Sequence, residues 1–187
     1  MYQLLFSCND RPHGKSWSEW TILWWKWRLP ISSSNNPQYH QYDHNVIFLP
    51  YSFFEYKEND LTLPAGKDLF FPSITAINSE REDKRMKTDQ DLIQWSREDV
   101  GRVAKRDVTI NGQWLESVPV CSEPFDTEYP TCNRWNVAPG PSRAICAGYW
   151  IFIRGLSAGK YEIRTHGACL AGKIKRDVHY SLTFTSS

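Results

Sequence analysis

A chain of 187 residues with 41% hydrophobic side chains is long enough for a single domain with a sizeable core, and too apolar to be disordered. Its 22 basic and 21 acidic residues leave a formal net charge of +1, which excludes the basic surface of a nucleic-acid-binding protein. No stretch reaches the roughly 20 apolar residues that cross a bilayer, so no membrane span is predicted. The unusual feature is the aromatic content of nine Trp, nine Tyr and nine Phe, because such side chains fill cores and also form binding surfaces.

A short helix is predicted near the N-terminus. Ser16–Glu19 has the Ser-x-x-Glu form of a capping box, and Pro30 ends the segment. One face of this helix carries four indoles at spacings of three and four: Trp17, Trp20, Trp24 and Trp27. We expect this face to pack beneath a sheet rather than to bind a ligand. Trp25 falls outside the stripe and is expected to be exposed.

The polar segment Ile31–Asn45 is predicted to be a loop. It carries a possible metal-ligand set of two imidazoles and one carboxylate, which suit zinc or copper: His40, Asp43 and His44. A loop does not fix the relative positions of these side chains. The alternative is therefore that they make ordinary polar contacts at the surface.

Short apolar runs and turn residues fill the middle of the chain. Strands are predicted at Val46–Leu49, Leu61–Leu63, Leu69–Phe71 and Val118–Cys121. A second helix is predicted over Thr88–Ala104 from its amphipathic spacing. Asp107–Leu115 is predicted to be a hairpin because Asn111-Gly112 suits a type I′ turn. Glu123–Pro141, with four prolines, is predicted to be a long loop.

The last third has the clearest β pattern, over Ala144–Arg154, Lys160–His166 and Asp177–Phe184. Apolar and polar residues alternate in the last of these, which is typical of a strand with one buried face. The sequence therefore predicts one domain over residues 1–187. It is mainly β, an antiparallel β-sandwich of jelly-roll or immunoglobulin-like type, with a Trp-rich N-terminal helix and one further helix.

Five cysteines leave the redox state open. Cys121 could pair with Cys132, and Cys146 with Cys169, or all could be buried thiols. His166 and His179 lie on strands that could be neighbours, with Cys169 close to the first. A catalytic Cys-His pair is conceivable there, but the sequence shows no third residue at a spacing that would orient the histidine.

Several aromatic residues are expected in loops, in turns or at the start of a strand, where they could be exposed: Tyr39, Tyr42, Trp114, Trp135 and Tyr149. The apolar faces of sugars stack on flat indole and phenol rings, and polar neighbours hold the hydroxyl groups. These residues are therefore candidates for a carbohydrate site. The alternative is that they fill the core and seal the edges of the sandwich.

Motifs spread over most of the chain resemble a family of often secreted bacterial and archaeal proteins. They include Gly14–Pro30 with its Trp-Trp-x-Trp helix, Leu63–Pro72 with a Pro-Ala-Gly-Lys turn, Val108–Leu115, Leu156–Lys160 and Asp177–Leu182. The resemblance implies an extracellular or cell-surface location but no activity or catalytic residues. The chain departs from it in two ways: its first residues, MYQLLFSC, are too few for a signal peptide, and Asn45–Asp60 lacks Cys and Gly.

Three functions remain open from the sequence. The first is a non-enzymatic binding module, without a cofactor, for carbohydrate or another extracellular surface ligand. The second is an assembly subunit of a surface layer, filament or larger complex that uses its aromatics as interface anchors, so an oligomer is possible. The third is a metal-dependent hydrolase or oxidase using His40, Asp43 and His44.

Overall fold

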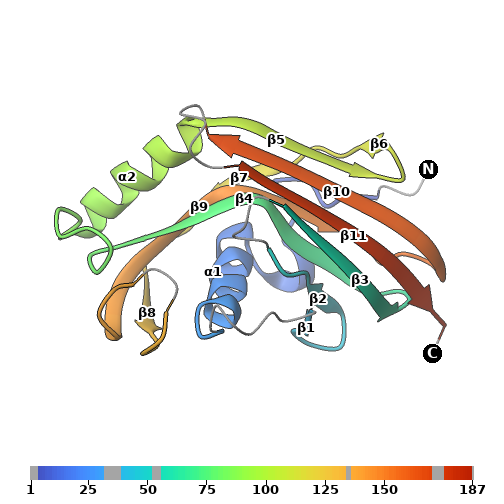
Figure 1. The fold of residues 1–187 in the computed structure, drawn as a ribbon, viewed down its shortest axis with the longest axis horizontal. Coiled ribbons are helices and arrows are strands. Elements are labelled where there is room, and N and C mark those ends of the chain that lie inside the picture. The colour runs from blue at the N-terminus through green and yellow to red at the C-terminus, as the bar shows by residue number, and fades with distance from the viewer. Residues whose placement is uncertain (1–3, 32–38, 52–55, 134–135, 170–174, 187) are drawn as a thin grey trace.

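The protein is mainly β, with two packed sheets and two α-helices in the part of the chain that the structure describes (Figure 1). This computed structural model describes residues 4–31, 39–51, 56–133, 136–169 and 175–186. The predicted β-sandwich is confirmed. None of the helices in these ranges is long and apolar enough to cross a membrane.

The first sheet contains the longest strands. Its described strands run in the order β1 (His40–Gln41), β2 (Val46–Phe48), β4 (Asp68–Ser79), β9 (Gly140–Ile153) and β7 (Val118–Cys121), with β8 (Phe125–Tyr129) also paired to β9. Neighbouring strands pair antiparallel, except that β2 and β4 run parallel to each other. Two of them were not expected. His40–Gln41 pairs with β2, and β8 forms a hairpin with the start of β9 inside the predicted loop Glu123–Pro141.

The second sheet, called sheet B below, has the order β3 (Tyr56–Pro64), β11 (Lys175–Thr185), β10 (Gly159–Cys169), β5 (Val103–Ile110) and β6 (Gln113–Trp114). Only β3 and β11 are parallel among these described strands. The hairpin between β5 and β6 is confirmed, because Asn111 and Gly112 both have positive φ, 49° and 80°, as a type I′ turn requires.

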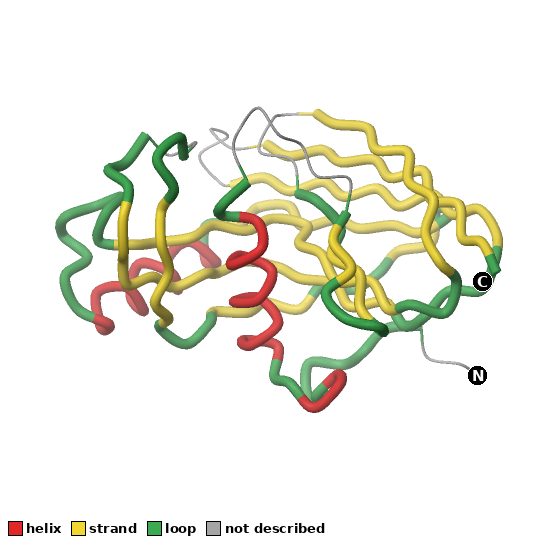
Figure 2. Tube along the Cα trace, turned by 90° about the horizontal axis from the view of Figure 1, so that it is seen from below, coloured by secondary structure: helices red, strands yellow, loops and turns green. Residues whose placement is uncertain are grey.

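Helix α1 (Trp17–Arg28) lies inside the curve of the first sheet and crosses its long strands (Figure 2). It begins with the predicted capping box between Ser16 and Glu19. Trp20 and Trp24 are 0% exposed, so core packing of the indole stripe is confirmed. The expectation that Trp25 is exposed is wrong. This side chain is 1% exposed and its Nε1 donates to Thr75 Oγ1 of β4 at 3.2 Å, because the curved sheet covers more than one face of the helix.

A second core fills the space between the two sheets. β9 contributes Ile151 and Ile153 from one face of the first sheet, and β11 contributes Tyr180 and Leu182 from the inner face of sheet B. Helix α2 (Asp89–Gly101) is capped by Thr88 and Asp91. It ends three residues earlier than predicted, because Val103 already belongs to β5.

All five cysteines are free thiols. Cys146 on β9 is buried in the cluster beneath α1, and its sulfur lies 3.3 Å from Thr21 Oγ1. Cys169 on β10 instead lines a cavity next to Gly148 and Ile74. The two cysteines therefore do not form the pair that the sequence left open.

A polar cluster beside β4 gives a pH-dependent contribution to stability. Glu82 Oε2 accepts a hydrogen bond from Tyr129 Oη at 3.2 Å, and Tyr129 Oη lies 3.0 Å from Ser79 Oγ. Burial raises the pKa of Glu82 from 4.5 to about 7, and the negative charge of Asp99 nearby also raises it. The folded state therefore binds this proton more tightly than the unfolded chain, and the resulting stability is lost as the pH rises from 4.5 through about 7.

Replacing Glu82 with Gln removes this loss and keeps a neutral hydrogen-bonding side chain. We expect the variant to gain about 1–2 kcal/mol of unfolding free energy relative to the wild type between about pH 5 and about pH 8. Urea denaturation at the two pH values measures this gain. The exposed Glu80→Gln is the matched control and should show none. A difference between Glu82→Gln and wild type that is the same at both pH values would contradict the assignment.

Candidate binding groove on the outer face of sheet B

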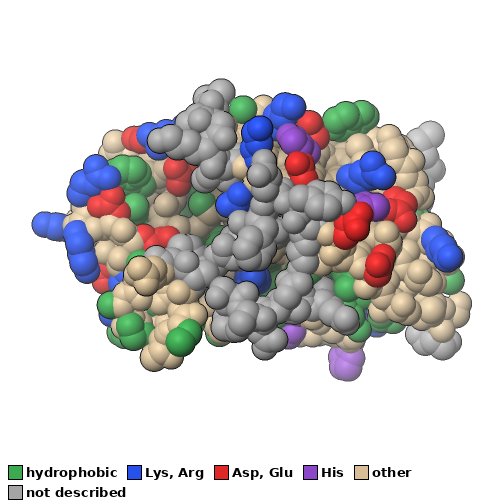
Figure 3. Space-filling view, viewed as in Figure 1, with side chains coloured by type: hydrophobic (Ala, Val, Ile, Leu, Met, Phe, Trp, Pro, Cys, Tyr) green, Lys and Arg blue, Asp and Glu red, His purple; other side chains and the backbone are tan. Residues whose placement is uncertain are grey.

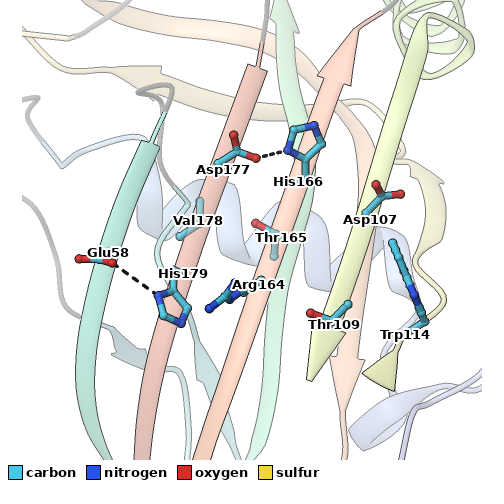
Figure 4. Close-up of a pocket in the computed structure, with 10 residues that line it drawn as sticks. All are labelled: Glu58, Asp107, Thr109, Trp114, Arg164, Thr165, His166, Asp177, Val178 and His179. Carbon is cyan, nitrogen blue, oxygen red and sulfur yellow. Dashed lines mark hydrogen bonds and ion pairs between the residues drawn. The ribbon is translucent and has the colours of Figure 1, made fainter. Parts of the chain in front are cut away.

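A groove of about 450 Å³ lies on the outer face of sheet B (Figure 4). Its lining residues come from all five described strands of that sheet: Glu58, Asp107, Thr109, Trp114, Arg164, Thr165, His166, Asp177, Val178 and His179. Figure 3 shows histidine and acidic side chains next to one another over the right half of the molecule, where Figure 1 shows β3 and β11.

Strand alternation explains why polar side chains face outward here. On β10, Ile163 is fully buried against the core while Arg164 is exposed. On β11, Tyr180 is buried and donates through its hydroxyl to Pro50 O, while His179 points to the outer face. Because successive side chains of a strand point to opposite faces, one phase builds the core and the other lines the groove.

The strand register places the groove residues in a row across the sheet. Trp114 lies opposite Thr109, Thr109 opposite Arg164, Arg164 opposite His179, and His179 opposite Glu58. Asp107, His166 and Asp177 form a second row beside it. The row begins with an aromatic ring at the β6 edge and continues with polar groups.

Both histidines are held by carboxylates. His166 Nδ1 contacts Asp177 Oδ1. His179 Nε2 contacts Glu162 Oε2, and its Nδ1 lies 3.7 Å from Glu58 Oε1. Ser181 Oγ donates to the same Glu162 oxygen at 3.3 Å. These contacts fix the rings in place, and the serine hydroxyl is directed to a carboxylate rather than to an imidazole.

Two charged groups of the groove have no such partner. Within the described residues, the side chains of Asp107 and Arg164 make no hydrogen bond or ion pair. Asp107 lies close to Trp114 in the groove, and Arg164 lies between His179 and Thr109 (Figure 4). A carboxylate offers only hydrogen-bond acceptors and a guanidinium only donors. Together, Asp107 can accept from the hydroxyl groups of a ligand and Arg164 can donate to them.

Trp114 stands out among the aromatic residues. Its side chain is 67% exposed. Among the residues that the structure describes, no other large hydrophobic side chain is exposed. The type I′ turn at Asn111-Gly112 holds β6 against β5, and Asn111 Oδ1 accepts a hydrogen bond from Glu162 N of β10 at 2.8 Å. The indole is therefore presented by a fixed hairpin rather than by a loose loop.

The structure places Tyr39, Tyr42 and Tyr149 away from this groove. Tyr42 packs on Trp20 and Phe48 in the core beneath α1, and Tyr39 packs against the core between the sheets. Tyr149 is half-buried beneath the Arg106 guanidinium, which lies 4.8 Å from the ring centroid. Trp135 lies outside the described residues.

The predicted metal ligands have other contacts. The His40 ring stacks on Trp27, with ring centroids 5.5 Å apart, and burial lowers its pKa. Asp43 Oδ1 accepts from the backbone amides of Asn45 and Val46 at 2.7 and 3.0 Å. The exposed His44 accepts through its carbonyl from Lys67. In the described ranges no group of three His, Cys, Asp or Glu side chains could hold a metal ion, so the geometry does not support this site.

The conceivable Cys-His pair is also not formed. His166 lines the outer groove, whereas Cys169 lines a separate, mostly apolar cavity of about 250 Å³. The charged groups at that cavity, Asp99 and Arg102, pair with each other at 3.7 Å. The exposed groove therefore remains the better candidate for a binding site.

Comparison with known proteins adds little to this geometry. No family model and no curated protein matches the sequence. A solved structure titled "Structure of PbICP-C in complex with falcipain-2" aligns with 75% of this chain and 99% of that chain, at 12% identity and a TM-score of 0.30. A similarity at this level carries no argument about function. What the fold and the groove define is a β-sandwich with a polar groove that ends at an exposed indole.

Proposed function

We propose that this chain is a non-enzymatic carbohydrate-binding module whose ligand lies in the groove on the outer face of sheet B. The observation that carries the proposal is the exposed indole of Trp114 beside the unpaired Asp107 and Arg164. The resemblance to often secreted proteins favours an extracellular ligand, for which polysaccharides are an abundant class.

The chemistry of these three side chains suits a sugar. An indole presents a flat apolar face on which the C–H groups of a pyranose ring can stack. Asp107 can accept hydrogen bonds from hydroxyl groups, and Arg164 can donate a fork of them to neighbouring hydroxyl oxygens. An apolar contact with a few convergent polar groups is the usual composition of a small-ligand site.

The alternative of an assembly subunit has less support. Interfaces between subunits bury a core patch in which aromatic and other apolar residues are enriched. On the described surface the exposed large hydrophobic side chain is Trp114 alone, and polar side chains surround it. A single indole in a polar groove fits a hydroxylated ligand better than a protein interface.

A binding screen against soluble and insoluble polysaccharides tests the proposal. Specific retention in pull-downs is expected, together with a change in Trp emission. Because Trp114 is the described Trp residue that lines the groove, the emission change should disappear in Trp114→Phe. Retention by no member of a broad panel would overturn the proposal.

Asp107→Ala and Arg164→Ala test the polar contacts. Each removes a charged hydrogen-bonding partner of the ligand, so each is expected to weaken binding about tenfold, as measured by isothermal titration calorimetry. Arg97→Ala on α2 removes an exposed guanidinium that does not line the groove and should leave the affinity unchanged. Full affinity in both groove variants would exclude this binding mode.

A further inference from the structure

We infer that the ligand is a linear chain of several sugar units that lies across the strands of sheet B, rather than a single sugar or a chain end. This inference rests on the proposed function and specifies its ligand class. It depends on the direction and the length of the groove and on the polar groups beside it.

The direction follows from the strand register. Trp114, Arg164 and His179 belong to one row of directly opposite residues, from β6 through β5, β10 and β11 to Glu58 on β3. The groove lining includes every member of this row. A ligand that stacks on Trp114 and follows the groove must therefore run across the strands.

The length follows from the spacing of strands. Four steps of about 4.8 Å separate β6 from β3, which makes the row about 19 Å long. One extended pyranose unit is similar in length to one step between strands. A single sugar on Trp114 would reach Thr109 and Asp107, but it would not contact His179 or Glu58. The polar groups beyond Arg164 can be used only by further units of the same chain.

Further polar groups lie beside the groove on the same face of the sheet. A second hollow of about 310 Å³ flanks the groove, lined among others by Glu162, Ser181 and Asp60, which are the next row of opposite residues on β10, β11 and β3. It adjoins the first, because His179 of the groove contacts Glu162 of this hollow. A pocket for a monosaccharide would enclose its ligand, whereas a sheet face with adjoining polar hollows has room for a chain of several units.

A chain-length series tests this inference on the full chain. Disaccharides, tetrasaccharides and hexasaccharides of each neutral polysaccharide retained in the screen are titrated by calorimetry. We expect the affinity to rise about tenfold or more from disaccharide to tetrasaccharide, as additional polar contacts form, and to rise little beyond that. Equal affinities for disaccharide and hexasaccharide would overturn this inference while leaving the proposed function intact.

A pair of variants separates the two ends of the groove. Trp114→Ala should weaken the binding of every chain length. His179→Ala should weaken hexasaccharide binding and leave disaccharide binding unchanged, with an unchanged melting temperature showing that the fold is kept. A His179→Ala variant that binds hexasaccharide as tightly as the wild type would contradict the inference. If no length binds to the wild type, the proposed function fails, and this inference fails with it.

Discussion

Replacing Trp114 with alanine is expected to weaken polysaccharide binding about thirty-fold or more while leaving the fold intact. The indole is 67% exposed, so its removal uncovers no core. Aromatic side chains at the centre of a binding site commonly contribute about 2 kcal/mol or more, which corresponds to this change in the dissociation constant. Calorimetric titration of the retained polysaccharide measures the affinity, and thermal unfolding checks the fold.

Gln113→Ala is the matched control for this variant. Gln113 is the other residue of β6 and is exposed, but its side chain points to the opposite side of the strand from Trp114. We expect its affinity to equal that of the wild type. Equal affinities for Trp114→Ala, Gln113→Ala and wild type would show that the ligand does not use the groove.

Replacing Trp20 with alanine is expected to cause the largest loss of stability, about 3–5 kcal/mol. The side chain is 0% exposed and makes edge contacts with Phe48 and Phe152. Its Nε1 donates to Pro12 O at 3.0 Å, so the substitution also leaves a buried carbonyl without its donor. Such a loss is a large part of the typical stability of a domain.

Trp27→Ala is the control for the same residue type on the same helix. Trp27 is only half-buried, where it stacks on His40. Urea denaturation followed by circular dichroism should therefore give a clearly smaller loss than for Trp20→Ala. Similar losses for both variants would mean that the complete burial of Trp20 does not determine its contribution to stability.

Local signals predicted much of the fold. The capping box at Ser16 and the Asn-Gly turn act over three or four residues, so they are visible in the sequence. The prediction failed for Trp25, because helical periodicity assumes one covered face and cannot show that a curved sheet encloses α1. The strand β8 was also not predicted. The prolines around it favour a loop, whereas the strand is stabilised by its pairing with β9.

The candidate site could be predicted only in part. Trp114 follows an Asn-Gly turn and is one of the five aromatic residues that the sequence marks as candidates for exposure. Asp107 and Arg164 were not identified, because they are more than 50 residues apart in the sequence and meet only through the pairing of β5 with β10. The structure does not gather His40, Asp43 and His44 into a ligand set, because aromatic stacking and backbone contacts hold the first two side chains. Long-range strand register is the information that the sequence alone does not contain.

The most direct test of the account is to map the ligand on the protein. A ¹⁵N-labelled sample is titrated with a panel of neutral hexasaccharides, and amide chemical-shift changes are followed by NMR. We expect the changes to cluster on β5, β6, β10 and β11, at Thr109, Trp114, Arg164 and His179. Changes confined to other elements, such as the residues around α1 or the apolar cavity at Cys169, would contradict it.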